Sequence, residues 1–240
     1  MMIKVDRLKK KVNTEPDPVL NDISFQMETG EMIGLVGASG SGKSLLLSCL
    51  ALREKWDGGR FLIDGDNMLT PAGKKRIRRE WAYLEQSPQL NVNRTALKNV
   101  LIGQSAQTPW WRMLTGMVRS DDYMGAMDTI EQFGLLDKAH RKASVLSGGE
   151  RQRIAIARAL VHGANVILAD EPVTGLDPKS AEHVLQTLKG LCEEERLTVI
   201  TVIPLELAER YCTRIIGLSG GKVAVDVTGR RLTHGEKSRL

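Results

Sequence analysis

Alternating apolar and polar positions near the start of the chain predict strands. Residues 23–27 (Ile-Ser-Phe-Gln-Met) alternate in the manner of a half-buried strand. Residues 32–36, 166–169 and 197–202 are instead almost continuously apolar, as in strands buried on both faces. These buried runs alternate with helical patterns. The sequence therefore predicts an α/β fold around a mixed, largely parallel sheet, with an antiparallel β-subdomain at its N-terminal end.

The middle of the chain has a helical periodicity and few strand signals. Between about residues 91 and 142 apolar residues recur three or four positions apart. The sets are Ala96, Val100 and Leu101; Met113, Leu114, Met117 and Val118; and Met127, Ile130, Phe133 and Leu136. The pattern predicts a helical subdomain inserted into the α/β core.

These patterns divide the chain into one domain and a tail. Residues 1–229 are expected to form a single domain, whose core consists of residues 1–90 and 150–229. Residues 91–149 form the predicted helical subdomain. The polar, basic tail, residues 230–240, is expected to be frayed.

Composition supports a globular protein. The chain has 240 residues, of which 42% are hydrophobic but only 4% aromatic, so aliphatic side chains must fill the core. The longest apolar stretch, residues 45–52, is far shorter than the roughly 18 residues that a membrane span needs. No signal-peptide pattern opens the chain, so a cytoplasmic location is expected.

The charge balance adds little to the picture. The net charge is +5, and the densest basic cluster, residues 74–79, has no interleaved aromatic residue for base stacking. We expect an exposed helix there and no nucleic-acid partner. Cys49, Cys192 and Cys212 stand alone among apolar neighbours, which indicates small buried thiols and neither disulfides nor metal ligands.

A glycine-rich loop follows the predicted strand 32–36. Its sequence, Gly37-Ala-Ser-Gly-Ser-Gly-Lys-Ser44, fits the phosphate-loop template, and an apolar helix follows it. The backbone N–H groups of such a loop surround phosphate oxygens. Lys43 is expected to contact the β- and γ-phosphates, and Ser44 to ligate Mg²⁺.

Two carboxylates end the buried strand 166–169. Asp170 is predicted to lie at the carboxyl edge of the sheet, where ligands of α/β proteins bind, and to hold Mg²⁺ with Ser44. Glu171 is predicted to act on the attacking water as general base or orienting group. A bare acidic boundary between strand and loop is the alternative interpretation of this pair.

The segment Leu146-Ser147-Gly148-Gly149-Glu150 precedes an apolar helical pattern. Taken alone it is typical of a helix N-cap. Together with the phosphate loop, Asp170-Glu171 and the run Glu150–Leu160, however, it resembles the signature of the ATP-binding-cassette (ABC) family of P-loop ATPases. The resemblance extends from Ile3 to about Gly229.

The resemblance implies that two subunits close over two ATP molecules with Mg²⁺. Ser147, Gly148 and Gly149 would bind the γ-phosphate of the nucleotide on the partner subunit. Asp177, in the run Thr174–Pro178, would communicate across the dimer. Gln86 would reach Mg²⁺ and the attacking water. The nucleotide-binding set on the phosphate loop is Gly37, Ser39, Gly40, Ser41, Gly42, Lys43, Ser44 and Leu45.

Two positions depart from the family pattern. The family has a histidine that contacts the γ-phosphate where this chain has Ile203, and an aromatic residue that stacks on adenine near Val12. Loss of one comparable electrostatic group costs roughly a hundredfold in rate. We therefore expect ATP to be bound, and the two departures bear on the rate of hydrolysis rather than on binding.

Within the family the chain is most similar to the ATP-binding subunits of phosphonate importers, in residues 90–103 among others. Trp110-Trp111 coincide with an aromatic insertion of that group, although a core or lid pair is an alternative. The resemblance implies an importer ATPase, a homodimer or a dimer with a related subunit, docked on membrane permease subunits and served by a substrate-binding protein. A subunit of a phosphonate-degrading complex and a slowly hydrolysing, nucleotide-gated module remain alternatives.

Overall fold

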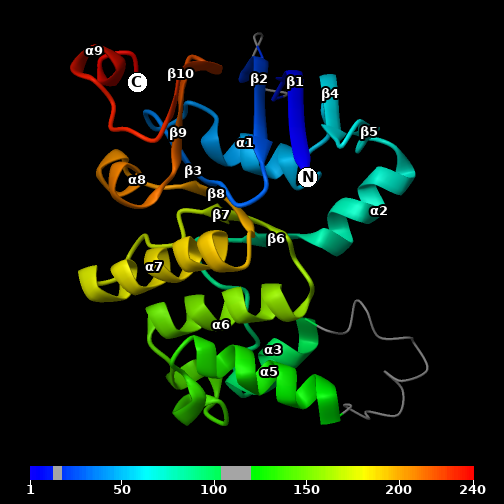
Figure 1. Cartoon of the computed structure of the whole chain (residues 1–240), viewed down its shortest axis with the longest axis vertical. Helices are drawn as coiled ribbons and strands as arrows, with labels where there is room; N and C mark the ends of the chain where they lie inside the picture. The colour runs from blue at the N-terminus through cyan, green and yellow to red at the C-terminus, as the bar shows by residue number, and fades with distance from the viewer. Residues whose placement is uncertain (13–17, 104–119) are drawn as a thin grey trace.

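The computed structural model describes residues 1–12, 18–103 and 120–240 (Figure 1). Its strands are β1 (Met2–Lys10), β2 (Leu20–Glu28), β3 (Met32–Val36), β4 (Gly58–Ile63), β5 (Asp66–Asn67), β6 (Trp81–Leu84), β7 (Val166–Asp170), β8 (Thr198–Val202), β9 (Arg214–Ser219) and β10 (Lys222–Thr228). Its α-helices are α1 (Lys43–Leu50), α2 (Pro71–Glu80), α3 (Ala96–Leu101), α5 (Ser120–Gln132), α6 (Gly148–Val161), α7 (Pro178–Glu194), α8 (Leu205–Tyr211) and α9 (His234–Lys237), and two 3₁₀ turns are η2 (Leu136–Lys138) and η3 (Ala143–Val145).

A six-stranded sheet in the order β10-β9-β3-β8-β7-β6 forms the centre of the molecule. The strands from β9 to β6 are parallel, and only β10 is antiparallel to its neighbour. β3 and β7 flank β8, so their carboxyl ends emerge at one edge of the sheet. The loop after β3 and the carboxylates after β7 therefore meet there, as predicted.

Side chains on β7 show how both faces of this sheet are covered. Ile167 and Ala169 pack with apolar residues of α6 and α7. Val166 and Leu168 point the opposite way and pack with α1 and the second sheet. Because both faces are buried, the strand must be apolar at every position, which explains its unbroken hydrophobic run.

The second sheet is antiparallel, in the order β2-β1-β4-β5. Its inward residues, such as Ile3, Ile23 and Phe61, pack against α1, which lies between the two sheets. The predicted α/β class, with a mixed sheet and an N-terminal antiparallel β-subdomain, is confirmed.

Helices α3, α5 and α6 form a layer on the far side of α7 (Figure 1). Leu97, Val100, Ile130, Phe133 and Ile154 join them in one buried cluster. Because α6 contacts α3 and α5 on one side and α7 on the other, it connects the helical layer to the core. The predicted set Met113–Val118 and the pair Trp110-Trp111 lie outside the described residues.

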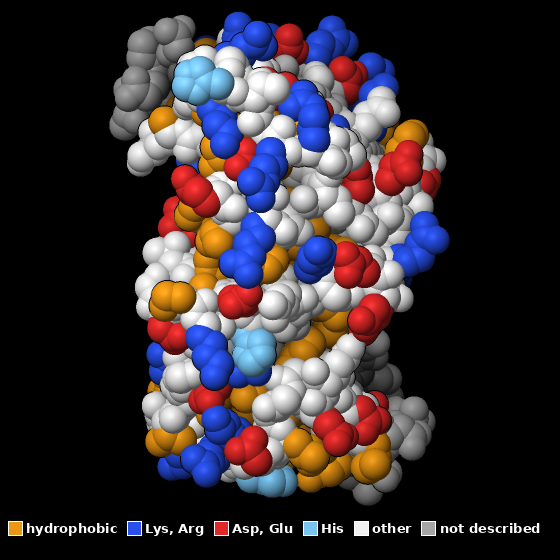
Figure 2. Space-filling model, turned by 60° about the vertical axis from the view of Figure 1, so that its left-hand side comes forward, with side chains coloured by type: hydrophobic (Ala, Val, Ile, Leu, Met, Phe, Trp, Pro, Cys, Tyr) orange, Lys and Arg blue, Asp and Glu red, His pale blue; other side chains and the backbone are white. Residues whose placement is uncertain are grey.

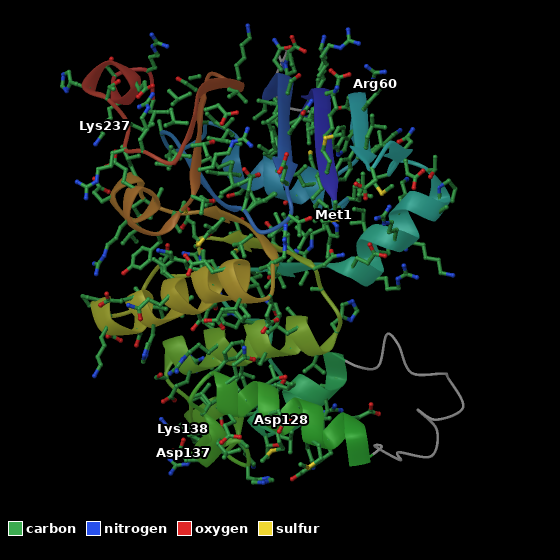
Figure 3. The ribbon with its side chains drawn as sticks, in the orientation of Figure 1. Met1, Arg60, Asp128, Asp137, Lys138 and Lys237 are labelled. Atoms are coloured by element: carbon green, nitrogen blue, oxygen red, sulfur yellow. The ribbon has the colours of Figure 1, made fainter. Side chains whose placement is uncertain are left out.

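The end of the chain packs against the core, which argues against the expected frayed tail. Leu232 is only 6% exposed. Leu240 packs so closely on β9 that a Cβ added to Gly217 would lie 2.2 Å from its Cδ2. Lys237, labelled on α9 in Figure 3, pairs with Glu209 at 2.9 Å. Two leucines and neutralised charges fix the segment, a signal that its polar composition concealed.

The surface mixes charges of both signs. On the face in Figure 2, Lys and Arg side chains are interspersed with Asp and Glu. The predicted basic helix is α2, in which Gly73 and Ile77 are buried, Arg76 and Glu80 are half-buried, and the other residues are exposed. Of its arginines, Arg76 pairs with Glu80 at 3.0 Å. Over the described residues, no helix has the length and apolar character needed to span a membrane.

Candidate functional site

The phosphate loop joins β3 to α1 through three glycines with positive φ. The φ angles of Gly37, Gly40 and Gly42 are 143°, 80° and 96°. At Gly37 there is also no room for a side chain, because a Cβ would lie 2.2 Å from the carbonyl oxygen of Leu218. Glycine is thus required both by conformation and by contact with β9, and the backbone forms a concave, anion-accepting turn.

Lys43, the first residue of α1, folds back over this loop. Its Nζ donates to the carbonyl oxygens of Gly37 (2.9 Å) and Ala38 (2.7 Å). Burial lowers the pKa of Lys43, although the charges of Glu171 and Asp170 oppose the shift. The ammonium group is therefore held by the loop that would bind phosphate, where an anion would become its counter-charge.

Ser44 and Asp170 meet as the sequence predicts. Ser44 Oγ donates to Asp170 Oδ1 at 2.8 Å. The second carboxylate oxygen accepts a 3.0 Å hydrogen bond from the hydroxyl of Tyr83 on β6. Burial, assisted by the charge of Asp170, raises the pKa of Tyr83 to about 12, so its hydroxyl remains protonated and donates. A hydroxyl and a carboxylate oxygen are the hard donors that Mg²⁺ prefers.

Glu171 has an unusual backbone conformation for its residue type. Its φ is 49°, in the left-handed region that non-glycine residues rarely adopt. Thr174 Oγ1 donates to its Oε2 at 3.1 Å. Such strain persists only where the surroundings impose it, and it is common at functional sites. Glu171 lines the same cavity as Lys43.

A cavity of about 540 Å³ lies over these residues. Of the predicted residues it is lined by Gly37, Ser39, Gly40, Gly42, Lys43, Ser44, Leu45 and Glu171. Ser41 is buried beneath the loop. Four further lining residues were not predicted, namely Val19, Thr174, Val202 and Pro204. Thr174, Val202 and Pro204 are close in sequence to the predicted Glu171 and Ile203, whereas only the tertiary structure brings Val19 there.

The turn Leu146–Glu150 begins α6 and is not part of that cavity. Ser147 is the N-cap and forms a reciprocal capping box with Glu150. The backbone N–H of Glu150 donates to Ser147 Oγ at 3.3 Å, and the backbone N–H of Ser147 donates to Glu150 Oε2 at 2.9 Å. Glu150 also pairs with Lys138, which Figure 3 labels in the helical layer. The predicted helix start is therefore confirmed, and the turn is held rigidly from both sides.

This turn packs on the segment that contains Asp177. A Cβ at Gly148 would lie 2.8 Å from Leu176, and one at Gly149 would lie 2.7 Å from Ser180. Asp177 is the N-cap of α7 and accepts from the backbone N–H of Ser180 at 3.0 Å. Two motifs that are far apart in sequence thus share one surface, and a side chain at Gly149 would overlap the Cβ of Ser180.

A comparison with known families decides what this arrangement belongs to. The sequence model of the family described as ABC transporter matches residues 20–174, which is more than half of the chain. The chain belongs to the ABC transporter family. Phosphonates import ATP-binding proteins of Stutzerimonas stutzeri and Bacillus anthracis are 39% and 38% identical to this cassette. The alignments cover 93% and 86% of the cassette and 83% and 82% of those relatives.

Solved structures give the same family for this cassette. The ATP-binding cassette MJ0796, in a dimeric post-hydrolysis state bound to ADP and Pi, matches with a TM-score of 0.80 and 30% identity. The alignment covers 96% of the chain and all of that structure. cbiO1 from Clostridium perfringens, 23% identical with a TM-score of 0.82 over 95% of the chain and 88% of its own, shares the fold. The chain is an ABC-type ATPase.

Of three other predicted positions, Ile203 lines the cavity, whereas Gln86 and Val12 do not. Ile203 is 3% exposed and lines the cavity beside Pro204, so an apolar wall stands there. The side chain of Gln86 is exposed after β6 and does not line the cavity. Val12 is 38% exposed and is not among the residues that line the cavity, whereas Val19 is.

Proposed function

We propose that this chain is the ATP-hydrolysing subunit of an importer for phosphonate or a related phosphorus oxyanion. The single observation that carries the proposal is one cavity lined by the phosphate loop, Ser44 and Glu171, with Asp170 hydrogen-bonded to Ser44. The printed names of the relatives supply the substrate class. The subunit would act on the inner face of the cell membrane, with permease subunits and, indirectly, a substrate-binding protein.

Residues of one cavity would divide the work on ATP. The loop amides and Lys43 bind the phosphates, and Leu45 follows at the start of α1. Ser44 and Asp170, already 2.8 Å apart, would hold Mg²⁺ together with Gln86 after a movement of its loop. The ion, when bound, neutralises phosphate charge. Glu171 takes or orients the proton of the attacking water.

The other half of each site would come from a second cassette, either an identical chain or a related subunit. Ser147, Gly148 and Gly149 are outside the cavity of their own chain, and Ser147 is exposed at the N-terminus of α6. A helix N-terminus favours an anion, which supports binding of the partner's γ-phosphate there. Asp177, packed beside this turn, would respond to closure of the dimer.

Steady-state ATPase activity, with and without the neighbouring permease in liposomes, tests the proposal. Glu171→Gln should reduce turnover at least a hundredfold while nucleotide binding persists, and Lys43→Ala should weaken binding. Phosphonate uptake that depends on ATP and on Glu171 supports the importer. Activity that instead requires a carbon–phosphorus-cleaving complex would favour the phosphonate-degrading alternative.

The apolar wall at Ile203 favours a second candidate, a nucleotide-gated module that hydrolyses slowly. Ile203→His should then raise turnover by up to roughly a hundredfold, because it adds an electrostatic group beside the γ-phosphate. Ile203→Leu is the control for repacking. If the unaltered chain already turns over at a rate that Ile203→His does not increase, the slow-module candidate is wrong.

A further inference from the structure

Tyr83 lies on β6, shortly before Gln86, and its hydroxyl contacts Asp170, the proposed carboxylate ligand of Mg²⁺. The register of the parallel pair β6–β7 sets Tyr83 opposite Leu168. Asp170 lies two residues beyond Leu168, so it is on the same face of the sheet. The tyrosine hydroxyl consequently reaches Asp170 Oδ2 at 3.0 Å, on the oxygen that Ser44 does not use.

Two further side chains contact the tyrosine: Ser48 forms a hydrogen bond with it, and Arg53 packs on its ring. The guanidinium of Arg53 lies 4.1 Å from the centre of the Tyr83 ring, a cation–π contact that fixes the plane of the ring. Arg53 in turn pairs with Glu85 at 2.8 Å. The hydroxyl thus points to Asp170 from a side chain whose orientation is set independently of the carboxylate.

The same contacts extend toward the helical layer. Glu85, next to Gln86, accepts a 3.0 Å hydrogen bond from the side chain of Gln89. The carbonyl oxygen of Gln89 accepts from Arg158 of α6 at 2.6 Å. A continuous path of polar contacts therefore joins Asp170, through Tyr83 and Arg53, to the helix that begins with the signature turn.

We propose that Tyr83 is a positioning residue, which orients the Asp170 carboxylate for the metal ion and is itself set by the Arg53–Glu85 pair. The inference rests on the proposed function, because it concerns the Mg²⁺ that accompanies ATP. The two oxygens of an aspartate carboxylate exchange positions when the group rotates about the Cβ–Cγ bond. With Ser44 on one oxygen and Tyr83 on the other, that rotation is restricted and the ion meets a preformed ligand.

Metal binding and nucleotide binding are measured separately to test this role. Mn²⁺ replaces Mg²⁺ in the ADP-loaded chain, and its binding is followed by loss of the free-ion paramagnetic resonance signal. ADP affinity is measured with a fluorescent ADP in excess EDTA. Tyr83→Phe, which keeps the ring beneath Arg53, should weaken Mn²⁺ binding roughly tenfold, the effect of one hydrogen bond to a charged group. ADP affinity in EDTA should be unchanged.

The chain offers a matched control. Tyr211 also donates to a carboxylate, Glu182 at 3.3 Å, and Arg210 lies 5.1 Å from its ring centre, but this triad is on α7 and α8. Tyr211→Phe should leave Mn²⁺ binding unaltered. Arg53→Met should also weaken Mn²⁺ binding. In the double variant, the fold loss of Mn²⁺ affinity should be smaller than the product of the two single losses.

The possible results distinguish a failure of the Tyr83 role from a failure of the proposed function. If the unaltered chain binds neither ADP nor Mn²⁺, both are overturned. If the unaltered chain binds both and Tyr83→Phe binds Mn²⁺ with the same affinity, only the positioning role is overturned. Equal losses of ADP affinity in EDTA and of Mn²⁺ affinity would also overturn it, because they would reveal a general structural defect.

Discussion

Gly37 and Gly40 both have positive φ, but their surroundings differ. A Cβ at Gly37 would lie 2.2 Å from a backbone oxygen of β9, whereas a Cβ at Gly40 would have no atom within 4 Å apart from its chain neighbours. Conformational freedom alone thus explains Gly40, and close packing adds a second requirement at Gly37. The motif template treats the two glycines alike, and only the fold distinguishes them.

Gly37→Ala should therefore be far more destabilising than Gly40→Ala. We expect the first to lower the free energy of unfolding by about 3 kcal/mol or more, since it adds an overlap with backbone to the strain. The second should cost about 1 kcal/mol, the strain of a left-handed residue. Urea unfolding of the nucleotide-free chain measures both. Equal losses would contradict the contact with Leu218.

At the scale of the element, the N-terminus of α6 depends on Glu150. Burial alone would raise the pKa of this carboxyl, but the ion pair with Lys138 and the hydrogen bonds from Ser147 outweigh it and hold the pKa below its ordinary value of 4.5. A carboxyl with a lowered folded-state pKa stabilises the fold above its unfolded-state pKa. That stability is lost as the pH falls through the folded-state value.

Glu150→Gln should accordingly lower the free energy of unfolding by about 1 kcal/mol at pH 7, through loss of the charged cap. The difference from the unaltered chain should shrink as the pH falls below about 4.5. Denaturant midpoints between pH 7 and pH 3 measure this, and Glu194→Gln on the exposed end of α7 controls for loss of a surface carboxylate. A difference that is constant with pH would argue against the ionic cap.

At the scale of the whole molecule, the C-terminal segment closes the edge of the core beside β9 and β10. The backbone N–H of Leu232 donates to Glu209 on α8 at 3.0 Å, and its side chain belongs to the cluster that includes α7 and α8. The segment thus packs back on the elements that precede it, α8 and β9. Its polar residues form the outer surface, and its leucines form the inner one.

Leu232→Ala should lower the free energy of unfolding by about 2 kcal/mol, because it leaves a cavity at a buried site. Leu136→Ala, at a leucine that is 42% exposed, is the matched control and should cost less than about 0.5 kcal/mol. Thermal unfolding of both variants decides between an ordered and a frayed tail. No change in Tm for Leu232→Ala would restore the frayed interpretation.

Local sequence patterns were sufficient to predict the α/β class, the phosphate loop, the pairing of Ser44 with Asp170 and the start of α6. Each of these depends on local periodicity, turn chemistry or the common edge of parallel strands. The contacts of Tyr83, the clash that requires Gly37 and the burial of Leu232 became visible only in the folded structure. These depend on residues far apart in the chain. Such a contact has no local periodicity, and its energy arises only once the sheets and helices have packed.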